Sequence, residues 1–318
     1  MSRPAWDVLV AGAGPAGSTA ARILAGRGLH VALADRLDRP SRRLEVVSPS
    51  LQPLLRGLGY LDLLDDPRVA RGCLGIERRW GSASPQLEDF LAHPGGVGHV
   101  IDRARFDTVL RERAGAAGAT FIPLRVVEAR AKAGTVNVRL SDGGTLTAAT
   151  VIDATGRAAA VARRLGAKRI CSERLTALLY ERLPDPEGDA PGWLQVTGAS
   201  DRWQYTVQGP GQLRETWTIS PARKGGGGST TDASSARLNQ AAGANWAAVG
   251  DAAAAFDPVT SQGLANAFST AAVAAGMILA GGDPDEASIY SHAVAATYAR
   301  SEHARRDIYL ALASPGRN

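Results

Sequence analysis

The hydrophobic pattern of the first 35 residues predicts a strand–helix–strand unit. Residues 8–11 and 30–34 are short apolar runs typical of buried strands, and residues 18–27 between them have the pattern of a helix. The second strand ends at Asp35. This order predicts the opening of a Rossmann-type α/β fold.

The same mixture of helices and strands continues toward the middle of the chain. Leucines at helical spacing predict a helix near residues 51–58, and residues 103–117 predict a second, amphipathic one. Asp142-Gly143-Gly144 is typical of a hairpin turn. Strands are predicted over 73–80, 97–102, 120–123, 126–131, 136–141, 145–147 and 150–154.

Four strand-like runs, separated by proline and glycine, predict an antiparallel sheet between residues 175 and 219. They cover 175–183, 193–197, 203–208 and 213–219. We expect this sheet to form the wall of a substrate domain. Its aromatic side chains suit a planar or apolar substrate, although they could equally be core residues of the sheet; the candidates are Trp193, Trp203, Tyr205 and Trp217.

The last part of the chain predicts a strand over 245–249 and helices over 260–280 and 286–312. Residues 264–282 are apolar enough to suggest a membrane helix. Their alanine, glycine, serine and threonine content favours a buried helix instead, so we expect no integral membrane segment.

Composition excludes several classes of function. The chain has 318 residues, 45% of them hydrophobic, and a net charge of +5. Its arginines form no dense run, which argues against a nucleic-acid partner. Cys73 and Cys171 make neither a disulfide framework nor a metal site, and we expect two buried thiols in a reducing, cytoplasmic compartment. No two histidines have metal-ligand spacing.

Residues 225–229, Gly-Gly-Gly-Gly-Ser, differ from their surroundings. They match the flexible linkers that protein engineers insert. We interpret them as a designed replacement of a natural segment, with a native loop as the alternative.

The loop at residues 12–17 is the first candidate ligand-binding site along the chain. It has the form G-x-G-x-x-G between a strand and a helix, the arrangement that binds a dinucleotide pyrophosphate at a helix N-terminus. An acidic Asp35 at the end of the second strand suits a ribose hydroxyl and would repel a 2′-phosphate. The unit therefore predicts FAD or NAD at this site.

Three further stretches follow in a fixed order: Val100–Asp107, Asp153–Arg157 and Val249–Leu264. Together with the loop, they resemble FAD-dependent enzymes of the aromatic-hydroxylase superfamily, which also holds flavin-dependent halogenases, geranylgeranyl reductases and maturases of peptidyl tryptophan. The resemblance covers nearly the whole chain. It implies an α/β fold with a glutathione-reductase-type FAD-binding domain and an inserted antiparallel-sheet substrate domain.

The resemblance also implies roles for individual residues. Asp251 would bond the ribityl chain, Pro258 would lie against the isoalloxazine ring, and Gly263 and Leu264 would offer backbone N–H groups to the pyrimidine edge of the flavin. Arg103 would reach the cofactor from its helix start. The expected FAD-binding set is Gly12, Gly14, Pro15, Ala16, Gly17, Asp35, Arg36, Arg43, Arg103, Thr155, Gly156, Gly250, Asp251, Pro258, Gly263 and Leu264.

Two departures from the family pattern affect the expected reaction. The hydroxylases carry Asp-Gly where this chain has Thr155-Gly156, which puts the usual nicotinamide contact in doubt. In the Gly-Glu-Ser stretch of halogenases and their relatives, only Glu45 has a match here. With one dinucleotide loop, NAD(P)H is expected as a transient reductant, unless a separate flavin reductase supplies electrons.

The preferred function is hydroxylation of a small or peptide-borne aromatic or indole-like substrate with O2 through a flavin C4a-hydroperoxide. The sequence identifies no catalytic side chain. Halogenation is an alternative, but the halogenase tunnel lysine and Trp-x-Trp-x-Ile-Pro signature are not visible. The protein could also be an isoprenoid saturase, or an engineered flavin-binding protein without turnover.

We therefore expect a FAD-binding domain assembled from discontinuous segments. Its parts would be 1–80, 119–171 and 233–318, the last including the C-terminal helices. Strand–helix elements near the flavin would occupy 81–118, the substrate sheet 172–222 and the linker 223–232.

Overall fold

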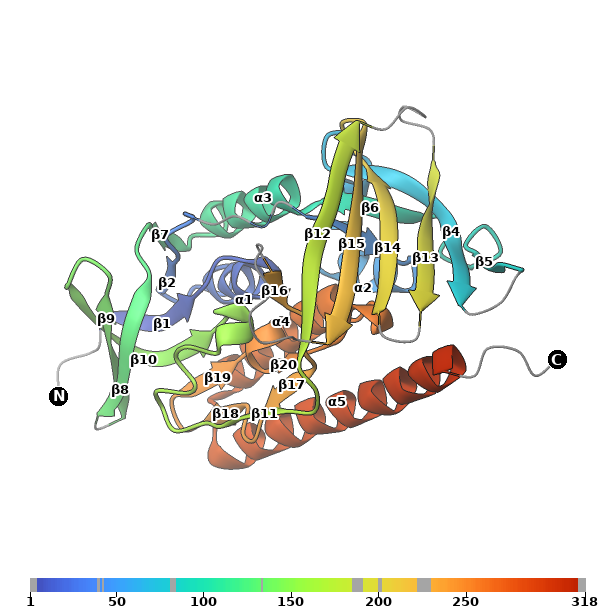
Figure 1. Ribbon diagram of the computed structural model, residues 1–318. Coiled ribbons are helices and arrows are strands. Elements are labelled where there is room, and N and C mark those ends of the chain that lie inside the picture. Colours follow the sequence, from blue (N-terminus) through green and yellow to red (C-terminus); the bar gives the residue numbers. More distant parts are fainter. Residues whose placement is uncertain are drawn as a thin grey trace.

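The computed structural model of the protein has a mixed α/β fold, as predicted (Figure 1). The structure describes residues 5–38, 41, 43–80, 84–132, 134–184, 191–199, 202–221 and 230–313. The segment 225–229 interpreted as a linker lies outside the described residues. Two large sheets, one three-stranded sheet and the helices between them make up the described chain.

The first large sheet contains the predicted strand–helix–strand unit. Its main path runs β18-β19-β10-β1-β2-β7, and β8 and β9 form an antiparallel extension on β10. Parallel pairing joins β1 to β2 and β10, β2 to β7 and β10 to β19. The bounds are β1 Trp6–Ala11, β2 Val31–Ala34, β7 Thr120–Ile122, β8 Val126–Lys132, β9 Thr135–Leu140, β10 Thr145–Asp153, β18 Ala242–Gly243 and β19 Trp246–Ala248.

Small side chains bring the helices close to this sheet. Helix α1 (Pro15–Ala25) buries Ala20, Ala21 and Leu24, and α4 (Gly263–Ala280) buries Ala271, Ala274 and Ala275 in the same core. Alanine is the best helix former and allows close packing of helices. The sequence therefore positions the N-terminal ends of α1 and α4 at one edge of the sheet, where β1 ends.

The second large sheet is predominantly antiparallel and has nine strands, with the order β16-β12-β15-β14-β13-β4-β6-β3 and β5 on β4. The four strands predicted between residues 175 and 219 are present, and strands from the first hundred residues join them, so the sheet extends beyond residues 172–222. The bounds are β3 Leu44–Val47, β4 Ala70–Trp80, β5 Gln86–Asp89, β6 Gly98–Asp102, β12 Leu175–Pro184, β13 Gly192–Ala199, β14 Arg202–Gly209, β15 Leu213–Pro221 and β16 Thr230–Asp232.

The long helix α5 (Pro284–Ala313) spans both halves of the protein (Figure 1). Its first turns pack on the nucleotide-side core through Ala287 and Tyr290, and its far end reaches the nine-stranded sheet. There the indole of Trp80 donates to the Ile308 carbonyl at 3.2 Å, and the indole of Trp203 donates to the Tyr309 hydroxyl at 2.9 Å.

The remaining elements connect these parts. Helix α2 covers Gln52–Gly57 and α3 covers Arg103–Ala116, close to the predicted spans, while the small sheet pairs β11 (Arg169–Cys171), β17 (Ala236–Leu238) and β20 (Ala254–Ala255).

By length and composition α4 could cross a membrane, but 44% of its apolar window is buried inside the protein, so this is weak evidence. The expectation of two buried thiols was wrong for Cys171, because the edge strand β11 leaves it exposed; Cys73 is buried.

Candidate flavin and substrate site

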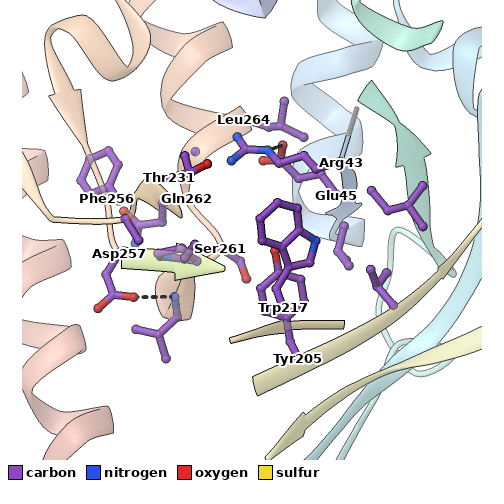
Figure 2. Close-up of a pocket in the computed structure, with 18 of the residues that line it drawn as sticks. Arg43, Glu45, Tyr205, Trp217, Thr231, Phe256, Asp257, Ser261, Gln262 and Leu264 are labelled. Atoms are coloured by element: carbon purple, nitrogen blue, oxygen red, sulfur yellow. Dashed lines mark hydrogen bonds and ion pairs between the residues drawn. The ribbon is translucent and has the colours of Figure 1, made fainter. Parts of the chain in front are cut away.

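A cavity of about 930 Å³ lies between the glycine-rich loop, the start of α4 and the nine-stranded sheet. We call it the main cavity, and Figure 2 shows lining residues from the start of α4 and from the sheet. Eleven of the sixteen predicted cofactor residues line the main cavity, although they come from five separate stretches of the chain. They are Gly14, Pro15, Ala16, Arg43, Arg103, Gly156, Gly250, Asp251, Pro258, Gly263 and Leu264.

Two loop glycines that do not line the main cavity make the loop possible. Gly12 has φ +105°, and a Cβ there would lie 2.2 Å from the Ala154 carbonyl oxygen. A Cβ on Gly17 would lie 1.8 Å from the Gly12 carbonyl oxygen. Gly14, by contrast, would meet nothing within 4 Å, so its backbone faces open space. This is the cradle that a pyrophosphate needs at a helix N-terminus.

Three other predicted cofactor residues do not line the main cavity. Two of them form hydrogen bonds that hold lining segments in place. The Asp35 carboxylate accepts from the Ala13 N–H at 2.7 Å and thereby holds the glycine-rich loop. Thr155 donates to the buried Asp153 carboxylate through both its backbone N–H and its hydroxyl. Arg36 is exposed and paired with Asp38, away from the main cavity.

Asp251 faces the main cavity beside an arginine that was not among the predicted cofactor residues. Arg157 Nε lies 3.4 Å from Asp251 Oδ2, and Arg157 Nη2 donates to the Phe256 carbonyl at 2.7 Å. Arg157 also donates to the Ser234 carbonyl and lines the cavity. It therefore fixes the Gly-Asp stretch relative to β10. Arg157 could have been predicted as a site residue, because it directly follows Gly156 in the stretch Asp153–Arg157 that carries the family resemblance.

The start of α4 offers uncapped backbone N–H groups. No side chain caps it, and its first turn contains no acidic residue. Such a helix end carries partial positive charge and favours an anionic group. Glu45 approaches from β3, with Oε1 3.6 Å from the point where a Cβ on Gly263 would lie. Figure 2 shows Glu45 and Arg43 beside Leu264.

Four charged side chains form what we call the Arg103 cluster: Arg43, Glu45, Arg103 and Asp107. Arg103 makes a bidentate pair with Asp107 at 2.9 and 3.0 Å and bonds Glu45 at 2.5 Å. Arg43 Nε lies 3.5 Å from Glu45. Burial opposes ionisation of Glu45, but the charges of Arg103 and Arg43 outweigh it and lower the pKa of Glu45. The predicted cofactor residue Arg103 is thus held by two carboxylates at the cavity edge.

The aromatic wall is partly as predicted. Trp203, Tyr205 and Trp217 line the main cavity, whereas Trp193 lies against Gly75 and does not line it. Neighbouring strand residues alternate between faces, and β13 turns Leu194 and Val196 inward. The Trp193 assignment to the wall is therefore corrected.

Further residues complete the wall. Trp80, which was not among the predicted wall residues, lines the main cavity. The fully buried Glu215 carboxylate accepts from the Trp217 indole at 2.9 Å and from the Leu44 N–H at 3.0 Å, so it ties this indole to the strand that carries Glu45. Burial raises the pKa of Tyr205, which keeps its hydroxyl protonated.

The main cavity contains no lysine among its described lining residues. Lys132 and Lys168 are exposed elsewhere, and Lys224 lies outside the described residues. His99, on β6, is also absent from the described lining; burial lowers its pKa, which favours the neutral imidazole.

This combination of a dinucleotide cradle, an uncapped helix start and an apolar chamber defines a flavoprotein of the oxidoreductase type. Residues 5–190 match the family model described as FAD binding domain, and the chain belongs to that family. The predicted membership of an FAD-binding family is therefore confirmed.

Two relatives show how far the similarity extends. Geranylgeranyl diphosphate reductase of Rhodobacter capsulatus is 39% identical over 114 residues, which cover 36% of this chain and only 27% of that protein. Menaquinone reductase of Mycolicibacterium smegmatis is 26% identical over 97% of this chain and 85% of that protein.

Solved structures share the fold. A peptidyl tryptophan dihydroxylase superposes with a TM-score of 0.80 at 22% identity, covering 99% of this chain and 76% of its own. The halogenase PltM superposes with a TM-score of 0.82 at 16% identity, covering 97% and 77%.

Proposed function

We propose that the protein is a FAD-dependent monooxygenase that hydroxylates an aromatic or indole-like group with O2. The observation that carries the proposal is the main cavity, which brings Trp203, Tyr205 and Trp217 together with Pro258 and the start of α4 around one space. When bound, FAD supplies the oxygen chemistry. The protein's task is then to hold an electron-rich ring beside it and to exclude water.

Several side chains have defined tasks in this proposal. The glycine-rich loop would hold the pyrophosphate, and Asp251, oriented by Arg157, would hold the ribityl chain. The N–H groups of Gly263 and Leu264 would meet the pyrimidine edge of the flavin, where the helix end stabilises negative charge by about 0.3–1 kcal/mol. The apolar wall would receive the substrate ring. The absence of a lysine from the described lining favours hydroxylation over halogenation.

The test starts with the reconstituted holoprotein and its visible absorbance. NADH and NADPH are added separately without oxygen, and bleaching identifies the reductant. If neither bleaches the flavin, either a separate reductase supplies the electrons or the protein is inactive. Indole and a tryptophan-containing peptide are then supplied with ¹⁸O2. We expect a product about 18 mass units heavier than its substrate, because hydroxylation inserts one ¹⁸O atom into a C–H bond. Reduction by NAD(P)H with no labelled product for either substrate would contradict the proposal.

A second candidate is saturation of an isoprenoid chain. The similarity to geranylgeranyl diphosphate and menaquinone reductases favours it, and the apolar wall would also suit an isoprenoid. It requires no O2. Loss of a double bond from geranylgeranyl diphosphate under strictly anaerobic conditions, with the FAD reduced beforehand to supply the two electrons, would support this candidate and argue against the first. The loss is detected as a gain of two mass units.

A further inference from the structure

A second cavity of about 440 Å³ lies beside the main cavity, on the same face of the nine-stranded sheet. Leu175, Ile219 and Pro221 supply its apolar side, and the end of α5 covers it through Tyr309 and Leu310. Its charged lining residues are Glu173, Arg202, Arg305 and Arg306. Trp203 is the described residue that lines both cavities. None of the predicted cofactor residues is among the described residues that line the second cavity.

The pairing register explains the position of Trp203. On β14, Trp203 is opposite Ile219, and two residues further along Tyr205 is opposite Trp217. Ile219 faces the second cavity, whereas Tyr205 and Trp217 face the main one. Because alternate residues of a strand share a face, these side chains form successive rows on one surface. The Trp203 indole therefore stands at the boundary between the two spaces.

Two hydrogen bonds hold this indole in place. Its N–H donates to the Tyr309 hydroxyl, and that hydroxyl donates to Asp257 Oδ2, each at 2.9 Å. Trp203 is only 4% exposed and Asp257 only 1%, so both groups depend on these partners. Asp257 directly precedes Pro258, at the expected flavin position.

We propose that Trp203 is a specificity-determining partition, which Tyr309 holds in place and which limits the length of substrate that the main cavity accepts. The proposal rests on the proposed function in treating the main cavity as the substrate chamber. Shortening Trp203 would join the two cavities. The enlarged chamber would then accept an aromatic ring with a long apolar tail, because Leu175, Ile219 and Pro221 add an apolar surface to it.

The test measures binding to the FAD-loaded protein by calorimetry, without turnover, for a series of 4-alkylphenols from phenol to 4-octylphenol. Each buried methylene strengthens binding by about fourfold until the cavity is full. We expect the wild type to lose this gain at a short chain and Trp203→Ala to retain it for several more carbons. Trp203→Leu, which keeps an apolar side chain, is the second variant should the alanine variant fail to fold.

Trp217→Ala is the matched control, because it removes an equally large side chain that lines the main cavity alone. In Trp217→Ala, the longest alkyl chain that still gains affinity per added methylene should be shorter than in Trp203→Ala. The same limiting chain length in the two variants would contradict the role of Trp203 as a partition. Binding of an n-alkanol series to the same variants tests the partition with ligands that have no aromatic ring. If the wild type binds the alkanols but not the phenols, the result contradicts the proposed aromatic substrate class and leaves the test of the partition intact.

Discussion

The two sides of the main cavity are built by different physical means. On the nucleotide side, the backbone forms the surface, and Gly12 and Gly17 are required because neighbouring carbonyl oxygens leave no space for a methyl group. On the sheet side, large side chains such as Trp203 and Trp217 form the surface on a regular backbone. One side therefore admits almost no variation, whereas the other can change its shape by single substitutions.

The largest effect is expected where the backbone is most constrained. Gly17→Ala places a Cβ 1.8 Å from the Gly12 carbonyl oxygen. We expect a loss of about 3 kcal/mol or more in the free energy of unfolding, measured in urea, because backbone cannot move aside as a side chain does.

Gly14→Ala separates folding from cofactor binding on the same loop. With nothing within 4 Å of the new methyl group, the free energy of unfolding should stay within about 0.5 kcal/mol of the wild type. FAD affinity should fall at least about tenfold, since Gly14 lets the backbone approach the pyrophosphate. Unchanged FAD affinity in Gly14→Ala would remove the basis for placing the pyrophosphate there.

The next effect concerns the Arg103 cluster, which lies where the nucleotide side of the main cavity meets the sheet side. Arg103→Leu leaves the carboxylates of Glu45 and Asp107 without their main partner in a buried place. Breaking a buried ion pair in this way costs about 3–5 kcal/mol. The control on the same helix is Arg105→Leu, whose exposed ion pair with Asp102 spans 3.7 Å and is worth less than about 1 kcal/mol. Similar losses in the two variants would show that the Arg103 cluster contributes little.

Glu45 makes the contribution of the Arg103 cluster to the free energy of unfolding depend on pH. Its pKa is lowered in the folded protein, so its ionised form stabilises the fold above the ordinary value of 4.5. This stabilisation is lost as the pH falls through the folded-state pKa. Glu45→Gln should therefore be less stable than the wild type at neutral pH, and the difference should shrink below pH 4.5. A difference in unfolding free energy that stays constant between about pH 7 and pH 3 would contradict this assignment.

Local pattern predicted the strand, loop and helix of the nucleotide side, because they lie within short stretches. The loop glycines and Asp35 are recognisable from spacing, the Gly-Asp stretch was assigned from the family resemblance, and most of the expected cofactor set lines one cavity. Partners that are distant in the sequence were missed. Arg157 bonds a carbonyl 99 residues away, and Trp80 meets α5 228 residues away. Strand periodicity separates the two faces of a sheet but does not say which is buried, and Trp193 was misplaced for that reason.

The smallest effect tests the sheet side. Tyr309→Phe keeps the ring and removes one hydroxyl, so Trp203 loses its acceptor and Asp257 loses a donor. A hydrogen bond contributes about 0.5–1.5 kcal/mol, and we expect a loss of about 1–2 kcal/mol in unfolding free energy. Tyr298→Phe, on the same helix, breaks only a 3.3 Å bond to Ser172 and should cost less.

The visible circular dichroism of bound FAD distinguishes a local from a general effect of Tyr309→Phe. Asp257 lies next to Pro258 and, among the described residues, keeps only the Val259 N–H donor when Tyr309 loses its hydroxyl. This loss should alter the flavin signal, whereas Tyr298→Phe should leave it unchanged. An unchanged signal in both variants would mean that α5 supports the sheet without reaching the cofactor side. A changed signal in Tyr309→Phe alone would mean that a single hydroxyl couples the adaptable wall to the constrained nucleotide side.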